Sequence, residues 1–199
     1  MTSTQRPAIP FSLLLVIALI SLPLLQGCVG AVVGAGAAVG VAAMEERGVD
    51  GKTRDIALET EIRAAYLDHD HRLTAAVGVE VYEGKVLLTG AIPEAAMRAD
   101  AVRLAWSVEG VSDVFNEIQE VDASLLDSAS DTWITTKLLS NLTFDKEVLG
   151  INYQIETVNS VVYLLGIAQN QAELDRVVAH ARNVDGVRQI ISHVRVKQP

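Results

Sequence analysis

The chain contains an internal repeat: when the sequence is shifted by 76 residues, its two halves align without a gap. Three pairs of segments carry the alignment: TEIRAAYL at 60–67 with TKLLSNLT at 136–143, GKVLLTG at 84–90 with SVVYLLG at 160–166, and SVEGV at 107–111 with NVDGV at 183–187. A repeat constrains the fold because each copy must form the same supersecondary unit. A copy of about 65 residues is large enough to fold as a small domain. The sequence therefore predicts two copies of one small domain.

Four glycines occupy matched positions in the two copies. Gly90 pairs with Gly166 directly after an expected strand, and Gly110 pairs with Gly186 directly after an expected helix. Glycine at such points is a common stop signal for regular structure. We expect structural roles for all four glycines, as the places where elements end.

Each copy shows the order helix–strand–strand–helix–strand. In the first copy, apolar residues recur at helical spacing over 58–66, valines alternate over 77–81, and Glu83-Gly84 suits a tight hairpin turn. A helical segment at 94–108 and a strand beginning near Val111 complete this copy. The second copy repeats the order, with helices at 131–142 and 172–184 and strands at 151–155, 161–167 and 187–196. We therefore expect an α+β fold of two tandem αββαβ sandwiches, each a three-stranded mixed sheet packed by two helices with a right-handed crossover.

The N-terminal segment has the layout of a secretory signal that ends at a lipidation site. Arg6 supplies a positive charge, an apolar stretch runs from Phe11 to Leu25, and Gln26-Gly27 precede Cys28. Small residues before a cysteine resemble the lipobox of bacterial lipoproteins, where the thiol receives diacylglycerol and cleavage leaves the cysteine as an N-acylated first residue. Cys28 is the only cysteine of the chain, which excludes an intrachain disulfide. An ordinary signal with a chance cysteine and an uncleaved anchor are the alternatives.

The lipobox resemblance also bears on location. An Asp after the lipidated cysteine tends to retain such a protein in the inner membrane, whereas this chain has Val29, which points to the periplasmic face of the outer membrane. The only expected prosthetic group is the covalent lipid on Cys28, including N-linked palmitate. Residues 29–44 are uncharged and rich in Gly, Ala and Val, but they are fewer than the ~20 residues that span a bilayer. We expect this segment to act as a tether.

The matched glycines, the KVLLTG strand and the EGV and DGV turns together resemble the BON (bacterial OsmY and nodulation) domain family. The segment SDTWITTKLLSNL at 130–142 is similar to the second domain of outer-membrane lipoproteins with two BON domains. The resemblance implies a non-enzymatic periplasmic protein that binds phospholipid and supports outer-membrane integrity, with the helix Asp131–Leu142 as its lipid-contacting element. The expected organisation is a signal peptide at 1–27, a lipidated cysteine and tether at 28–51, a first BON domain at 52–122, a linker at 123–130 and a second BON domain at 131–198.

Charge differs strongly between the two copies. Residues 45–122 hold 17 acidic and 8 basic side chains, a net charge of −9, whereas residues 131–199 hold 7 of each and are neutral. Anionic lipid headgroups repel an acidic surface within about a Debye length. If either domain contacts an anionic membrane, it should therefore be the second. An acidic chain without a basic stripe also argues against nucleic-acid binding.

A helical wheel of the segment 131–142 separates a core stripe from a second face. With Ile134, Leu138 and Leu142 toward the core, the other face holds Trp133, Lys137, Ser140 and Phe144. Aromatic rings flanking a lysine suit the boundary between lipid headgroups and acyl chains. The matched positions of the first copy are unsuited to this role: Ala57, Glu61, Ala64 and Asp68. Two alternatives stay open, namely that Trp133 packs against the other domain and that Phe144 lies beyond the helix end.

Other motifs give no stronger indication. The run Asp68-His69-Asp70-His71 offers four possible metal ligands, but adjacent side chains on a helix diverge, so we interpret it as a solvated loop and expect no metal site. Trp106 is interpreted as core or interdomain packing. No catalytic constellation or phosphate loop stands out, so we expect no catalytic residues. The competing hypothesis is an adaptor that binds an outer-membrane assembly protein, with lipid contact incidental.

Overall fold

The computed structural model describes residues 44–122, 124 and 126–198, and both repeats lie in the same compact unit of the chain. Cys28, the signal and residues 29–43 of the tether fall outside the described residues. The first domain contains α3 (Gly48–His69), α4 (His71–Ala76), β1 (Val77–Tyr82), β2 (Lys85–Gly90), α5 (Ala95–Trp106) and β3 (Asp113–Asn116). The second contains α6 (Ser128–Phe144), the 3-10 turn η3 (Gly150–Asn152), β4 (Tyr153–Val158), β5 (Val161–Ala168), α7 (Gln171–Arg182) and β6 (Gln189–Val196).

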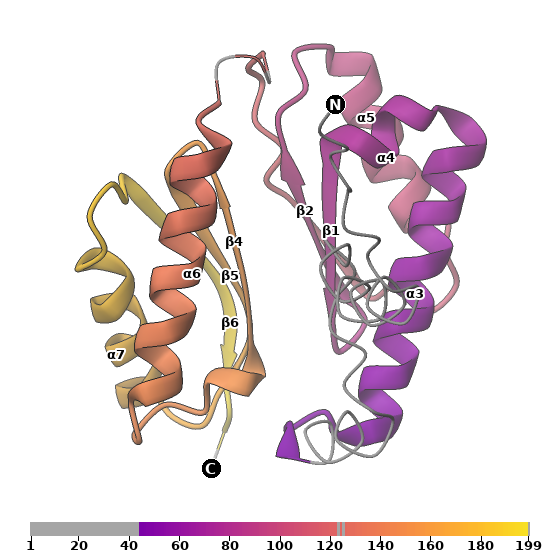
Figure 1. Cartoon of the computed structure of the whole chain (residues 1–199). Coiled ribbons are helices and arrows are strands. Elements are labelled where there is room, and N and C mark those ends of the chain that lie inside the picture. Colours follow the sequence, from indigo (N-terminus) through magenta and orange to yellow (C-terminus); the bar gives the residue numbers. More distant parts are fainter. Residues whose placement is uncertain (1–43, 123, 125, 199) are drawn as a thin grey trace, which may run out of the picture. The chain divides into compact units, whose positions relative to one another are not determined.

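Each domain is an α+β unit with a mixed three-stranded sheet. The strand orders are β1-β2-β3 and β4-β5-β6, with an antiparallel first pair and a parallel second pair in each sheet. In the second domain α6 and α7 cover one face of the sheet (Figure 1). The expected fold class, two tandem αββαβ sandwiches, is confirmed.

The strand-end glycines Gly90 and Gly166 sit opposite the first residues of the hairpins, Val77 and Tyr153. Both have positive φ values, 125° and 142°. A Cβ atom on Gly90 would collide with the carbonyl oxygen of Ala76, and one on Gly166 would collide with the matched carbonyl of Asn152. Only a residue without a side chain allows the backbone to pass so closely at these strand ends.

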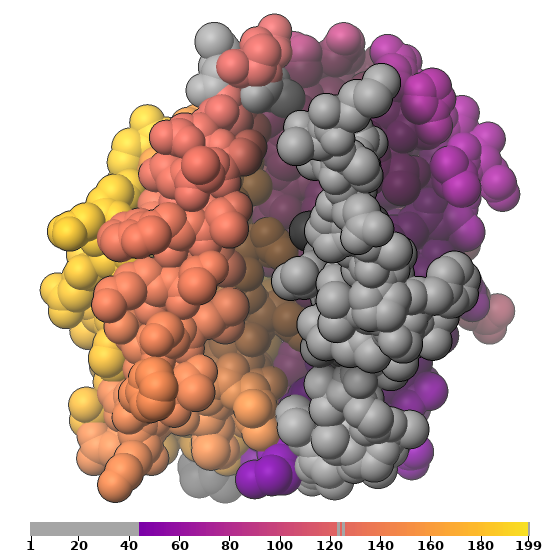
Figure 2. Space-filling model, in the orientation of Figure 1, coloured from indigo at the N-terminus to yellow at the C-terminus, as the bar shows by residue number. Residues whose placement is uncertain are grey.

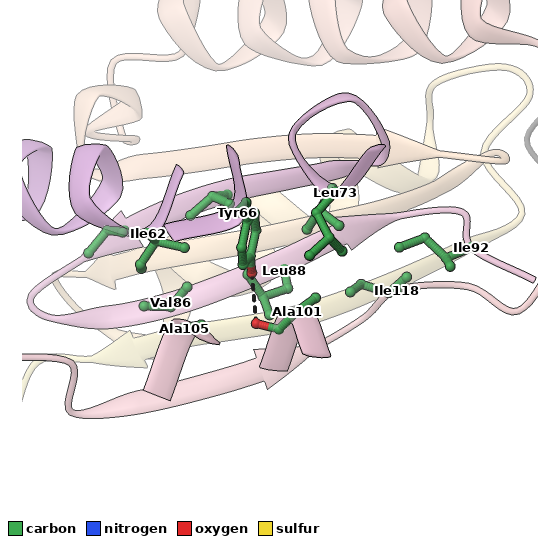
Figure 3. Packing of buried hydrophobic residues seen from close by; sticks show 12 residues of the cluster. Ile62, Tyr66, Leu73, Val86, Leu88, Ile92, Ala101, Ala105 and Ile118 are labelled. Atoms are coloured by element: carbon green, nitrogen blue, oxygen red, sulfur yellow. Dashed lines mark hydrogen bonds between the residues drawn. The ribbon is translucent and has the colours of Figure 1, made fainter. Parts of the chain in front are cut away.

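Two separate apolar cores support the helices. In the first domain Ile62 and Tyr66 of α3 pack against the inner face of the sheet and against Ala101 and Ala105 of α5 (Figure 3). The buried Tyr66 hydroxyl donates a hydrogen bond of 2.9 Å to the Ala101 carbonyl, which satisfies its polar atom. The second domain repeats this arrangement with its own buried cluster: Ile134, Leu138, Leu142, Val162, Leu164, Val177 and Ala181.

The sheet faces that turn away from the helices form a third apolar cluster. It joins Tyr82 and Leu87 of the first domain to Tyr163, Leu165 and Ile167 of the second. Strand β1 contacts β5, and β2 contacts β4. The central strands β2 and β5 are therefore covered on both faces, one by the helices of their own domain and the other by the second sheet.

Polar side chains lie at the border of this contact. His193 on β6 stacks on the ring of Phe115 with centroids 4.0 Å apart, and its Nε2 lies 2.8 Å from Oε1 of Glu117. Gln119 donates a 3.1 Å hydrogen bond to the Tyr163 hydroxyl. These contacts fix the register between the two sheets.

The segment before α3 contacts both domains. The buried Arg47 guanidinium forms ion pairs of 2.7 Å with Glu45 and with Asp55. The neighbouring Glu46 donates its backbone N–H to the Asn152 side chain of the second domain at 2.9 Å. Residues 45–47, which follow the tether, are thus bound to both domains.

Three expectations differ from the structure. Residues 68–71 are not a loop, because α3 continues to His69 and Asp70 caps the short helix α4 by accepting a hydrogen bond from the Arg72 backbone. Trp106 is not a core residue, since 49% of its surface is exposed at the end of α5. Helix α6 begins at Ser128, inside the segment interpreted as a linker.

Candidate functional site

Helix α6 is the element on which the candidate lipid-contact residues lie. Ile134, Leu138 and Leu142 are almost fully buried on its inner face, where they pack against the second-domain sheet and α7. Their spacing of four residues places them on one stripe, which drifts slowly around the helix. This stripe fixes which side chains point away from the core.

Hydrogen bonds at its N-terminal end hold α6 in place. Asp127 is the N-cap residue and accepts a hydrogen bond from the Ser130 N–H at 3.1 Å. One turn later, the buried Asp131 carboxylate accepts 2.8 Å hydrogen bonds from the N–H groups of Asn159 and Ser160. Those two residues form the β4–β5 hairpin turn, so the helix is pinned to the end of the sheet.

The outer face of α6 carries the residues that the wheel selected. Trp133 is 49% exposed and Phe144 is 83% exposed, and both Lys137 and Ser140 are exposed between them. Phe144 is the last residue of α6 rather than a residue beyond its end. Residues of α6 form a continuous column on the surface of the second domain (Figure 2). The structure thus brings all four predicted side chains to one exposed helix surface.

Sequence reasoning missed three further exposed apolar residues of the second domain. Leu139 lies on the outer side of α6, and Leu149 and Ile151 lie in the segment between α6 and β4. Leu139 could have been found, because it falls outside the core stripe of the wheel. Leu149 could not, because it lies outside the helices and strands, where no periodicity predicts which side chains are exposed.

A shallow hollow of about 480 Å³ lies at the C-terminal end of α6. Its lining residues are Asn141, Phe144, Asp145, Lys146 and His180. His180 Nε2 lies 2.7 Å from the Asp145 carboxylate, which ties α7 to the end of α6. Lys146 is exposed and forms no ion pair with another residue of the described part of the chain. An exposed ring and a free ammonium group therefore meet at this end of the helix.

The matched face of the first domain is equally exposed but chemically different. Ala57, Glu61, Ala64 and Asp68 lie uncovered on α3. They offer neither an aromatic ring nor a cation, and the domain around them has a net charge of −9. The outer face of α3 therefore lacks the aromatic rings and the lysine that α6 presents at the matched positions.

No metal centre can be assigned to the described residues. His69 Nε2 lies 3.3 Å from the Asp100 carboxylate, and the Asp70 carboxylate forms an ion pair with the Arg72 side chain. These possible metal ligands therefore bind other side chains. The Arg72 side chain lowers the pKa of Asp70 to about 2. Between residues 44 and 198, setting aside 123 and 125, no group of three or more His, Cys, Asp or Glu residues could hold a metal ion.

The two other glycines that the sequence singled out lie after helices, as expected. Gly110 and Gly186, at φ values of 101° and 91°, follow α5 and α7 and lie against Leu58 and Ile134. No helix within the described ranges is long and apolar enough to cross a membrane. Cys28 lies outside those ranges.

Comparison with protein-family models matches the BON domain at residues 54–122 and again at 130–198. The outer membrane lipoprotein DolP of Haemophilus influenzae is 33% identical over 171 residues, which cover 84% of this chain and 87% of that protein. The osmotically-inducible protein Y of Escherichia coli is 32% identical, with coverage of 72% and 73%. An uncharacterized protein in the gshII 5' region of Anaplasma centrale is 39% identical, with coverage of 64% and 85%. The two matched ranges fall on the two repeats.

Proposed function

This chain belongs to the BON domain family, of which it carries two copies, and from that premise we propose that it binds anionic phospholipid through the outer face of α6. It is a non-enzymatic protein of the cell envelope, in keeping with its relatives. We further propose that a lipid on Cys28 anchors it to the periplasmic face of the outer membrane, where it supports membrane integrity. The outer-membrane relative of Haemophilus influenzae supports this location.

One observation carries the lipid proposal: an aromatic ring stands uncovered at each end of an exposed helix face with a lysine between them. Trp133, Lys137 and Phe144 occupy that face, and burial of two aromatic rings would give a favourable apolar contribution at the headgroup boundary. Each exposed lysine near an anionic surface adds about 1 kcal/mol of attraction. The neutral second domain does not oppose this contact, unlike the acidic first domain.

The contact between the α6 face and lipid is weak by itself, but it is sufficient when the covalent lipid already holds the protein at the membrane. A second attachment on an already tethered molecule acts at a high effective concentration, so modest affinity is enough. We therefore expect the α6 face to orient the protein on the membrane, while the covalent lipid keeps it there.

The test uses a soluble form without residues 1–43, since the lipid anchor would hide any contribution of α6. Its binding to phosphatidylcholine vesicles with and without phosphatidylglycerol is measured by co-sedimentation. Trp133→Glu should weaken binding to the anionic vesicles at least about tenfold, which is about 1.4 kcal/mol. The matched control, Ala57→Glu on α3, should leave binding nearly unchanged.

Thermal melts accompany the binding curves, because only a folded variant is informative. A Trp133→Glu protein that melts like the parent and binds anionic vesicles equally well would overturn the lipid proposal. The adaptor hypothesis, in which the chain binds an outer-membrane assembly protein, would then be the better account.

A further inference from the structure

The contact between the two domains has approximate two-fold character. Strands β1 and β2 of the first repeat correspond to β4 and β5 of the second, and the contacts observed are β1 with β5 and β2 with β4. Exchanging the two copies leaves this set of contacts unchanged, as in the isologous interface of a homodimer. Such an interface places matched residues opposite each other near its axis.

Two matched glutamates lie on these paired sheet faces. Glu80 on β1 and Glu156 on β4 are separated by 76 residues, the repeat length. Alternate residues of β1 turn into the first core, so Glu80 shares the outer face with Tyr82, which belongs to the cluster between the sheets. In the sheets, Glu80 pairs with Leu87, and Glu156 pairs with Tyr163 of the same cluster.

The surroundings of the pair disfavour two negative charges. Burial, then the Glu156 carboxylate and then Glu59 raise the pKa of Glu80 to about 7, against the opposing effects of Arg63 and Arg47. Burial also raises the pKa of Glu156, and Arg63 opposes it. Both Glu80 and Glu156 are half-buried on these sheet faces. Neighbouring carboxylates that are partly shielded from water ionise with more difficulty than isolated, exposed ones.

We propose that the Glu80–Glu156 pair is a pH-responsive latch between the two domains: a proton on the pair keeps the sheets closed, and loss of that proton lets the domains part. Parting would uncover the apolar sheet faces that carry Leu87 and Leu165, which are fully buried in the closed form. Glu156 also lines a hollow whose wall includes Asp131 and Thr135 of α6. None of the four lipid-face side chains contributes to that hollow, so the latch and the lipid face use different residues.

The direction of the effect follows from linkage. A carboxyl group in the open form has its ordinary pKa of 4.5, and Glu80 in the closed form has a pKa of about 7. Protonation therefore favours the closed form. The stabilisation of the closed form is complete below pH 4.5 and is lost as the pH rises through about 7. The ratio of closed to open molecules should fall roughly 30-fold between pH 5.5 and pH 8.5.

Spin labels measure this directly in the full lipidated chain held in detergent micelles. Ala99→Cys and Ala179→Cys place labels on exposed positions of α5 and α7, one in each domain. Double electron–electron resonance should give one narrow distance distribution at pH 5.5. At pH 8.5 a second, longer and broader component should appear.

Two variants assign the effect to the pair. Glu80→Gln should keep the narrow distribution at both pH values, because no second charge can form. The control Glu61→Gln removes an exposed acid of the same domain and should leave the pH response intact. The same distribution at both pH values in the parent would overturn the latch, and so would a pH response that persists in Glu80→Gln.

Discussion

Asp131 makes in the second domain the contact that Asp55 makes in the first. The Asp55 carboxylate accepts 2.9 Å hydrogen bonds from the N–H groups of Glu83 and Gly84, and Asp131 does the same for the turn 159–160. In both repeats an acid in the first helix thus holds the hairpin turn of the sheet. Both carboxylates are buried, so the bonds are shielded from water.

Replacement of Asp131 should destabilise the second domain. Asp131→Ala leaves two N–H groups of the turn without an acceptor, and we expect a loss of about 1–3 kcal/mol in the free energy of unfolding. Chemical denaturation measures this loss. Asp131→Asn keeps one acceptor oxygen and should cost less, and the exposed N-cap variant Asp127→Ala should cost about 1 kcal/mol. Equal stability of Asp131→Ala and the parent would contradict this assignment.

Gly166 should be intolerant of any side chain. Gly166→Ala combines a backbone conformation rare for L-residues with a collision against the Asn152 carbonyl, so a loss of about 3 kcal/mol or more is expected. Gly150→Ala is the matched control, because its added Cβ would meet Leu142 at an ordinary 3.5 Å. Thermal unfolding of both variants should separate them clearly, and similar melting temperatures would show that the strand end can relax.

The internal repeat made the fold predictable from the sequence. It did not predict which side chains are exposed at the ends of helices and strands. The helix–strand order and the sites of the four glycines could be deduced because both copies carry the same periodicity. Trp106 was misjudged because it follows the buried Ala105, and one residue is a rotation of about 100° on a helix. Helix α4 was missed because it is short, and its counterpart in the second copy is only the 3-10 turn η3, while residues 147–149 lie outside regular structure.

The sequence also contained an indication that the two sheets pack on each other, although the alternation of apolar and polar residues does not reveal it. Val86-Leu87-Leu88 and Val161–Leu165 are continuous apolar runs, which are typical of strands covered on both faces. The wheel of α6, by contrast, selected the exposed Trp133 and Phe144 without a structure. It succeeded because three buried residues at four-residue spacing define the opposite face unambiguously.

Anchoring should depend on Cys28. Cys28→Ser removes the only thiol of the chain, so we expect an exported product that is unprocessed or soluble rather than fractionated with the outer membrane. Membrane fractionation and mass measurement of the mature N-terminus check this. A mature Cys28→Ser protein that still fractionates with the outer membrane would show that lipidation is not the main anchor.

The central claim, that the α6 face contacts lipid, is tested most directly by the fluorescence of Trp133. The chain has two tryptophans, so Trp106→Phe in the soluble form leaves Trp133 as the only indole reporter. Anionic vesicles that contain phospholipid brominated on the acyl chains quench an indole only when it reaches the headgroup–acyl boundary. We predict that Trp133 emission shifts to the blue and is quenched by these vesicles, and that neither change occurs with neutral vesicles. Unshifted and unquenched emission from protein that co-sediments with the anionic vesicles would contradict the account.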